Sequence, residues 1–423
     1  MKAILRKLAV LSIAALLVAA LAATLLVVTL PASLRAAPGE WSERVALGPV
    51  QLDVSVLGVI RVASHPLGLR ALAGRSWKTP IGTLHFSADP ERDSLTVICA
   101  PCAVRAPALS REPLQVVRAE LTLRRAGPNE LYGDLVAGSV RTAWLARLHP
   151  RDLDLELTLA DAPLADAYAL FGAAFPEAAR ARIEARAGAE IRLTLPSRHL
   201  VVKPHLEGFA VSGLGTEALL VATPLPACAR PTRKVDAAAP FGPWLPKAVV
   251  AAEDQRFFDH RGYDLDEMTA AWANDRKSGK APRGASTLSQ QLAKLLYTGE
   301  ERTLARKLRE LLYAVELDRT LGKQRVLTLY LAVAPWGEAR CGAQAAALDF
   351  FGKRASALGP IEAAWLASLL RNPDAELRRT VERGAPDRPR LGAILAGLHP
   401  LSHARREALV DDLRTWEAPA SGH

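Results

Sequence analysis

The N-terminal part of the chain is one unbroken apolar run. Residues 8–31, "LAVLSIAALLVAALAATLLVVTLP", contain no charged side chain. A helix of about 20 residues crosses the roughly 30 Å hydrocarbon core of a bilayer, whereas the apolar region of a cleaved secretory signal has about 7 to 15 residues. We therefore expect a retained transmembrane helix, with a cleaved signal as the alternative.

Basic residues before this run predict its orientation. Lys2, Arg6 and Lys7 precede it, and an excess of positive charge marks the cytoplasmic side of a span. Residues 1–37 are thus expected to form a cytoplasmic tip and an anchor, and the rest to lie outside. In a bacterium this predicts a single-pass inner-membrane protein with a periplasmic body. The net charge of +10 then favours anionic headgroups over nucleic acid as the partner.

Residues 38–225 show the pattern of a β-rich α+β domain. Short runs such as "VQLDVSVLGVI" (50–60), "DLDLELTLA" and "AEIRLTLP" alternate apolar and polar residues, which predicts antiparallel strands with one solvated face. One helical interruption is expected in "DAPLADAYALFGAAFPEAARARIEARAG", residues 161–188. No charged cluster in this domain looks catalytic, so a binding or spacing role is expected, with cell-wall synthases or other envelope proteins as candidate partners.

The periodicity changes after a stretch dense in proline and alanine. That stretch, residues 226–240, is typical of a linker. Residues 241–423 follow a helical pattern, for example "RTLARKLRELLYAVELDRTLGKQRVLTLYLA", which predicts a mainly α domain with a C-terminal helical tail. The fold class of the whole chain is therefore α+β.

Four cysteines follow the apolar run. Cys99 and Cys102 form "CAPC" between a predicted strand and a loop, whereas a redox C-x-x-C opens a helix. A local disulfide or two unreactive thiols is thus expected, rather than a catalytic pair. Cys228 and Cys341 could pair with each other, and the sequence leaves this open.

Glu253 lies at the most apolar turn of "WLPKAVVAAEDQRFFDHRG", residues 244–262. A carboxylate at such a turn would be desolvated, which raises its pKa toward the range that a general base needs near neutral pH. Asp254 points about 100° away on a helix, so the two acids cannot share one role. An ordinary solvated helix face is the alternative for this stretch alone.

A second group of polar residues follows in "RGASTLSQQLAKLLYTGEERTLARKLRELLYAVELD". Thr287 and Gln290 have the spacing of a capping box, and a helix N-terminus attracts anions. Four cations follow, and Glu310 shares a helix face with Lys307, three residues earlier. A solvated helix with internal ion pairs is the alternative. On a membrane-tethered chain, the combination suits a lipid-linked diphosphate.

Five motifs stand in order along residues 240–373: "AAEDQRFFDHRG", "RGASTLSQQLAK", "RTLARKLRELLYAVELD", "KQRVLTLYLA" and "CGAQAAALDFFGK". Together they resemble the motifs of the peptidoglycan glycosyltransferases of glycosyltransferase family 51, with a layout similar to the monofunctional biosynthetic transglycosylases. The resemblance implies a mainly helical, lysozyme-like domain. It also implies the polymerisation of lipid II into β-1,4 glycan strands with release of undecaprenyl diphosphate.

The resemblance assigns roles residue by residue. Glu253 matches the catalytic base, and Glu310 matches the second catalytic glutamate, which supports the departing diphosphate. The residues that match substrate and diphosphate ligands are Lys294, Arg302, Arg306, Lys307, Ser286, Gln290 and Gln291. Those that match site-shaping positions are Asp254, Phe257, His260 and Gly262. Mg²⁺ or another divalent cation could assist the diphosphate, although the sequence shows no dedicated carboxylate cluster for a metal. No organic cofactor is expected.

Three positions depart from the family pattern: Leu295, Thr328 and Ala332. They put processivity or helix packing in doubt more than the chemistry. No Ser-x-x-Lys tetrapeptide occurs, so no transpeptidase activity is expected. Two other functions remain as alternatives. One is a hydrolase that cuts the same polymer with paired carboxylates, and the other is a catalytically weak or silent scaffold that binds lipid II or synthase partners.

Overall fold

The computed structural model describes residues 34–419 apart from 35, 48–49, 90, 92, 106–112, 171, 173–174, 198, 222–240, 271–285, 302, 338–339 and 400. The predicted span, residues 8–31, and the predicted linker, residues 226–240, lie outside this part. None of the helices within it is both long and apolar enough to cross a bilayer.

Contacts divide the chain into two compact units. The first, here called the β-rich unit, contains the residues up to Val104 together with Gln115–Ala162 and Ala187–His205. The second, here called the helical unit, contains Arg105–Leu114, Pro163–Arg186 and everything from Leu206 onward. Two segments of the predicted β-rich domain, 163–186 and 206–221, therefore pack with the C-terminal helices.

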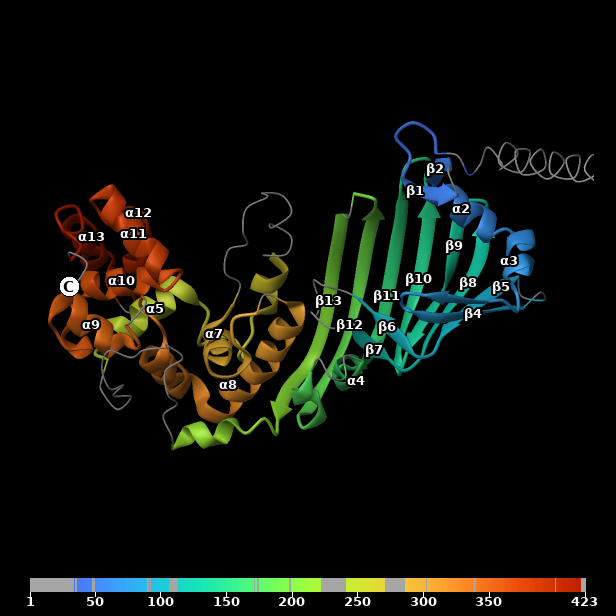
Figure 1. Cartoon of the computed structure of the whole chain (residues 1–423). Coiled ribbons are helices and arrows are strands. Elements are labelled where there is room, and N and C mark those ends of the chain that lie inside the picture. The colour runs from blue at the N-terminus through green and yellow to red at the C-terminus, as the bar shows by residue number, and fades with distance from the viewer. Residues whose placement is uncertain are drawn as a thin grey trace, which may run out of the picture. The chain divides into compact units, whose positions relative to one another are not determined.

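A nine-stranded sheet dominates the β-rich unit (Figure 1), with the order β13-β12-β11-β10-β9-β8-β5-β4-β3. Its strands are β3 (Ser76–Thr79), β4 (Gly82–Asp89), β5 (Ser94–Cys99), β8 (Ala119–Gly127), β9 (Glu130–Ala137), β10 (Val140–Leu148), β11 (Leu153–Pro163), β12 (Arg182–Leu195) and β13 (His199–Ser212). Two small sheets pair β1 (Ser42–Leu47) with β2 (Val50–Ser55), and β6 (Cys102–Val104) with β7 (Leu114–Val116).

The alternation along the strands separates a buried from a solvated sheet face. Trp144 on β10 lies opposite Leu157 on β11, and Leu148 lies opposite Leu153. Trp144, Leu148 and Leu153 belong to one buried apolar cluster, against which Leu157 packs. Arg147 points the other way and pairs with Glu130 and Glu156 on the neighbouring strands. This is the arrangement that the period-two pattern predicts.

Helix α2 (Val56–Ala63) covers part of the buried face, followed by α3 (Pro66–Leu72). Its Leu57 is fully buried in the cluster that contains Trp144 and Leu148. The expectation of one strand over residues 50–60 was wrong, because β2 ends at Ser55. The Ser55 hydroxyl accepts a hydrogen bond from the backbone N–H of Gly58 at 2.8 Å, and this N-cap starts the helix.

The predicted helical interruption at residues 161–188 is shorter in the structure. It consists of α4 (Leu164–Ala169) and the 3-10 turn η3 (Pro176–Ala179), and β12 begins at Arg182. The residues after Arg182 alternate exposed charges with half-buried apolar side chains. The helical expectation failed there because this period-two pattern outweighs the helix propensity of alanine.

Cys99 and Cys102 form a disulfide, with a Cα–Cα distance of 5.6 Å. It joins the end of β5 to the start of β6, and both residues are buried. Of the two expectations for "CAPC", a local disulfide or two unreactive thiols, the structure has the disulfide. Cys341 is disulfide-bonded as well, and Cys228 lies outside the described residues.

The helical unit has a large apolar core that includes the fully buried Trp336 and Trp365. Besides α4 and η3, its elements are η4 (Thr216–Leu220), α5 (Leu245–Glu253), α7 (Leu288–Ala293), the π-turn η5 (Lys294–Thr298), α8 (Leu304–Val333), α9 (Ala343–Phe351), η6 (Ala355–Ala357), α10 (Pro360–Leu369), α11 (Pro373–Arg383), α12 (Arg388–Ala396) and α13 (His403–Asp412). Gly322, with φ of 71°, interrupts α8.

Segments 163–186 and 206–221 pack against α8 within the helical unit. Glu177 forms a two-pronged ion pair with Arg309, with N–O distances of 2.6 and 2.7 Å. The buried carboxylate of Glu316 accepts hydrogen bonds from the backbone N–H groups of Leu214 and Thr216. These segments therefore belong to the scaffold of the helix that carries Arg306, Lys307 and Glu310.

Candidate active site

Glu253 is the last residue of α5, and its side chain is only 12% exposed. Gln291 donates from Nε2 to one carboxylate oxygen at 3.2 Å, and Arg390 donates from Nη2 to the other at 3.4 Å. Burial raises the pKa of Glu253, while Gln291, Arg390 and Arg371 oppose that rise. The result is a desolvated carboxylate with two donors aimed at it, which suits a group that must accept a proton.

Tyr330 orients the amide that contacts Glu253. Its hydroxyl donates to Oε1 of Gln291 at 2.8 Å, which leaves Nε2 of that amide facing Glu253. Tyr330 is buried, and desolvation raises its pKa well above the ordinary value, with the charge of Glu253 adding to the effect. The phenol thus stays protonated and remains a donor.

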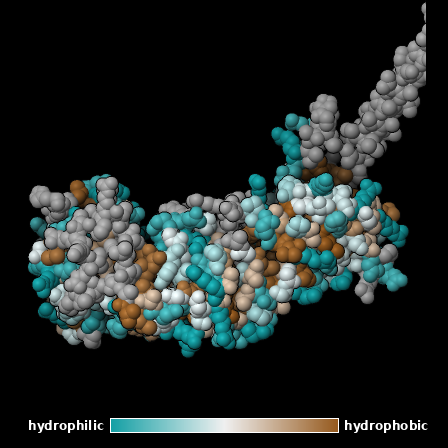
Figure 2. Space-filling model, turned by 60° about the horizontal axis from the view of Figure 1, so that its bottom comes forward, coloured by the Kyte–Doolittle hydropathy of each residue, from teal (hydrophilic) through white to brown (hydrophobic). Residues whose placement is uncertain are grey.

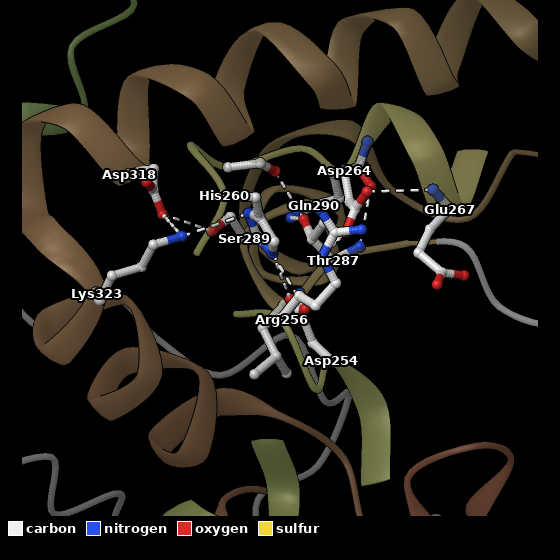
Figure 3. Close-up of polar contacts among 12 residues, drawn as sticks. Asp254, Arg256, His260, Asp264, Glu267, Thr287, Ser289, Gln290, Asp318 and Lys323 are labelled. Atoms are coloured by element: carbon white, nitrogen blue, oxygen red, sulfur yellow. Dashed lines mark hydrogen bonds and ion pairs between the residues drawn. The ribbon is translucent and has the colours of Figure 1, made fainter. Parts of the chain in front are cut away.

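Asp254 leaves the helix that Glu253 ends. Its backbone φ of −159° is not helical, and its side chain accepts a hydrogen bond from the backbone N–H of Leu288 at 2.8 Å. His260 Nε2 lies 3.1 Å from each of its oxygens. Asp254 therefore joins the end of α5 to the first turn of α7, and Figure 3 shows its contact with His260.

The start of α7 has the capping box that the sequence predicts. The Thr287 hydroxyl accepts from the backbone N–H of Gln290 at 3.2 Å, and the Gln290 side chain accepts from the backbone N–H of Thr287 at 3.0 Å. Thr287 also donates to the carbonyl of Gly262 at 2.7 Å. Gln290 is thereby occupied with the helix start, whereas Gln291 reaches Glu253.

Gly262 and Phe257 lie where the first motif meets α8. Gly262 has φ of +84°, and a Cβ there would lie 2.4 Å from the carbonyl oxygen of Ala314. Phe257 is fully buried, with Lys323 Nζ 4.6 Å from its ring centroid. Lys323 also pairs with Asp318 at 2.8 Å, and both are drawn in Figure 3.

A group of cations gathers at the start of α8. The Thr303 hydroxyl caps the backbone N–H of Arg306 at 3.1 Å. Glu310 is buried, and its two oxygens accept from Arg306 Nη1 and Lys307 Nζ. Lys307 also donates to the Ser286 hydroxyl at 2.6 Å.

The group around Glu310 is electrostatically tight. Burial lowers the pKa of Lys307, and the carboxylate of Glu310 opposes this, while Arg306 and Lys294 add to the lowering. Lys294 itself pairs with the exposed Glu300 at 3.0 Å. Two cations against one carboxylate leave a net positive charge, which suits an anionic ligand.

The structure thus brings the predicted residues into two groups that α7 connects. Glu253 and Gln291 form one group with Arg390. Ser286, Arg306, Lys307 and Glu310 form the other, which Lys294 influences. The structure around these two groups is held by Asp254, Phe257, His260, Gly262 and Gln290. Arg302 lies outside the described residues.

Sequence reasoning missed Arg371, Arg390 and the role of Tyr330. Arg390 contacts Glu253 from α12, 137 residues further along the chain. It lies beyond the five motifs. No local pattern links two residues at that separation. Tyr330 stands inside the fourth motif, "KQRVLTLYLA", so a buried tyrosine in a motif was the one available signal.

The residues around Glu310 do not fit a divalent cation held by the protein. Mg²⁺ prefers several oxygen ligands in octahedral geometry, whereas both oxygens of Glu310 already accept from cations. Among the described residues, the one set of side chains spaced for a metal ion is His149, Asp152 and Asp154 in the β-rich unit.

Comparison with known proteins adds independent evidence. Residues 224–391 match the model of the transglycosylase family. The chain is 46% identical over 129 residues to a protein of Nitrosomonas eutropha named biosynthetic peptidoglycan transglycosylase. The aligned residues are 30% of this chain and 53% of that protein. A protein of the same name from Azoarcus sp. is 45% identical over 129 residues, 30% of this chain and 56% of its own.

A third relative with this name, from Rhodopseudomonas palustris, is 41% identical over 154 residues, which is 36% of this chain and 66% of that protein. The chain spans a little over half the length of the first of these curated relatives. The family match at residues 224–391 covers both groups of site residues.

Proposed function

We propose that the transglycosylase domain at residues 224–391 polymerises lipid II into β-1,4 glycan strands and releases undecaprenyl diphosphate. The observation that carries the proposal is the buried carboxylate of Glu253 between Gln291 and Arg390. The names of the relatives support the same substrate class, and the separate cation group suits a diphosphate.

In the proposed reaction, Glu253 accepts the proton of the attacking 4-hydroxyl as its oxygen bonds to the anomeric carbon of the donor. The bond from that carbon to the diphosphate oxygen breaks, and the electron pair leaves with the diphosphate. Arg306 and Lys307 neutralise the leaving group, because a guanidinium binds phosphate oxygens in pairs and an ammonium acts as a point charge. Glu310 holds both cations in place.

The cation group distinguishes this reaction from hydrolysis of the same polymer. A glycosidase expels a neutral sugar and needs two carboxylates near the scissile bond. Here the second buried carboxylate, Glu310, is bound to Arg306 and Lys307. It is therefore occupied with cations instead of being free to act on a sugar.

The remaining expectations belong to the same proposal. The protein is an envelope protein, held by a span at residues 8–31 with its catalytic domain in the periplasm and a lysozyme-like arrangement of helices. Residues 38–225 contact envelope or cell-wall synthase partners. Mg²⁺, where it assists, arrives on the diphosphate, since the side chains around Glu310 are already paired.

The test compares the detergent-solubilised full chain with Glu253→Gln on labelled lipid II, with and without Mg²⁺, and resolves products by size. Polymer from the wild type and none from the variant is expected. Arg405→Gln, an exposed change of charge on α13, is the matched control and should polymerise normally. Bound but unpolymerised lipid II with both proteins would replace the proposal with the scaffold function. Shortening of glycan strands supplied in a parallel incubation would indicate a hydrolase.

A further inference from the structure

Helices α2 and α3 of the β-rich unit carry apolar side chains that no described part of the chain covers. Val59 is 44% exposed, Val62 is 40% exposed and Leu67 is 69% exposed. Val59 and Val62 stand three residues apart on α2 and share one side of that helix. Gly68 of α3 approaches the carbonyl of Val62 so closely that a Cβ there would lie 2.2 Å from it. The two helices therefore present these side chains as parts of one small surface, which we call the α2–α3 surface.

The segment that carries the α2–α3 surface is basic. Between Asp53 and Asp89 the chain contains Arg61, Arg70, Arg75 and Lys78, and no acidic residue. Arg61 is occupied, because its guanidinium bonds to Asn129 and to the carbonyl of His149. The others are exposed, and they are not among the ion pairs of the described residues. Exposed apolar groups beside unpaired cations are what an anionic lipid surface attracts.

Other exposed cations of the β-rich unit are paired with acids. On β10, Arg147 is paired with both Glu130 and Glu156, and on β12 Arg182 is paired with Glu184. Arg147 and Arg182 are thus each balanced by a neighbouring acid. Figure 2 shows apolar patches among hydrophilic ones at the surface of the β-rich unit, so exposed apolar side chains alone do not distinguish the α2–α3 surface.

The chain that leaves the predicted span is tied to the start of α2. The backbone N–H of Ala36 donates to the carbonyl of Asp53 at 3.3 Å, and that of Val56 donates to Trp41 at 3.0 Å. Glu40 accepts from the Ser55 hydroxyl at 2.6 Å and from the backbone N–H of Ala37. Ser55 is also the N-cap of α2, so this connection is part of the helix start.

Little chain separates this connection from the predicted bilayer. The apolar run ends at Pro31, so four residues precede Ala36, and five peptide steps reach at most about 18 Å. If the span crosses the membrane, the start of α2 must lie close to the headgroups. A short tether therefore holds a basic surface with exposed apolar side chains near an anionic interface.

From this we infer that the α2–α3 surface rests on the anionic bilayer that holds the N-terminal span, with Val59, Val62 and Leu67 toward the lipid and Arg70 and Arg75 toward headgroups. The inference rests on the proposed membrane anchor, and it needs no catalytic activity. It assigns the β-rich unit a contact with lipid in addition to any protein partner.

The test places a fluorophore at one position of the full chain, reconstituted in phosphatidylglycerol–phosphatidylethanolamine vesicles. Val62→Cys carries the environment-sensitive label, and none of the cysteines that the structure describes is free to compete. Thr158→Cys on β11 is the control, because Thr158 is exposed on the sheet face opposite to Leu157. Nitroxide-bearing lipids should quench the label at 62, with blue-shifted emission, and leave the label at 158 unquenched.

A second measurement tests the role of charge. The double substitution Arg70→Glu and Arg75→Glu should reduce the quenching at 62, as should replacement of the anionic lipid by phosphatidylcholine. Equal quenching of the labels at 62 and 158 would overturn the inference and leave a protein as the occupant of the surface. Quenching at 62 that does not change with lipid charge would overturn the electrostatic part of the inference. A chain that does not float with vesicles after a high-salt wash would refute the anchor and the inference together. Because the Glu253→Gln variant can carry the same labels, the outcome is independent of polymerisation.

Discussion

Arg390 donates a hydrogen bond to Glu253 at 3.4 Å from a helix 137 residues further along the chain. A guanidinium at that distance favours the ionised form of the carboxylate, whereas burial favours the neutral form. Burial therefore raises the pKa of the proposed base, and Gln291, Arg390 and Arg371 oppose that rise. The contribution of Arg390 can be removed by one substitution.

Arg390→Gln removes one of the effects that lower the pKa of Glu253. The pKa should rise further, so a higher pH is needed to ionise the base. We expect the acidic limb of the pH profile of kcat/KM for lipid II polymerisation to move to higher pH. The control is Arg405→Gln, which removes the same charge from an exposed site on α13. An acidic limb that does not move would show that Arg390 does not act on Glu253.

Glu253→Gln should stabilise the fold in a pH-dependent way. The folded-state pKa is raised above the ordinary 4.5, so the wild type is most stable below that value and loses stability as pH rises through the raised pKa. Glutamine lacks this loss. The variant should therefore unfold at a higher temperature than the wild type at neutral pH, with the difference shrinking at acid pH. An equal difference at both pH values would argue against a raised pKa.

Gly262→Ala should destabilise the helical unit. An alanine there would combine a positive φ with a Cβ 2.4 Å from the carbonyl of Ala314. Left-handed backbone alone costs about 1 kcal/mol relative to glycine, and the contact should bring the total loss of unfolding free energy to roughly 3 kcal/mol. Gly384→Ala is the matched control, since it has φ of +61° and open space around its Cβ. Equal losses in denaturant titrations would mean that the backbone relaxes around Ala314.

Glu316→Ala should lower stability because it leaves buried donors unpaired. The backbone N–H groups of Leu214 and Thr216, and the Thr216 hydroxyl, all donate to that carboxylate. Unsatisfied buried groups cost about 1–3 kcal/mol each, so we expect a loss on the order of 3 kcal/mol in chemical unfolding. Glu382→Ala, on the exposed side of α11, should change stability by less than about 0.5 kcal/mol. If Glu316→Ala lowered the free energy of unfolding by as little as Glu382→Ala, water would have replaced the carboxylate as the acceptor.

Local patterns predicted local structure well. The capping box of Thr287 and Gln290 and the shared helix face of Lys307 and Glu310 depend on spacings of three residues, and both are confirmed. Helix α2 was missed because one capping serine, Ser55, changes the conformation within an apolar stretch that reads equally well as a strand.

Contacts between distant segments could not be predicted in this way. Arg390 reaches Glu253, and Leu214 reaches Glu316, through tertiary packing across more than a hundred residues. Neither residue type nor spacing indicates such a pair. The motifs contain Gln291, which contacts Glu253, and Arg306 and Lys307, which contact Glu310. Tertiary packing decides which arginine and which backbone groups complete these contacts.

The attachment of segments 163–186 and 206–221 to α8 has a consequence for anyone who shortens this protein. A recombinant fragment that starts after residue 240 would retain the five motifs but lose Glu177, the partner of Arg309, and the donors that bind Glu316. A protease that cut between residues 222 and 240 would, in contrast, leave two pieces held together by these contacts. The helical unit is therefore longer than the five motifs and is built from segments that are discontinuous in sequence.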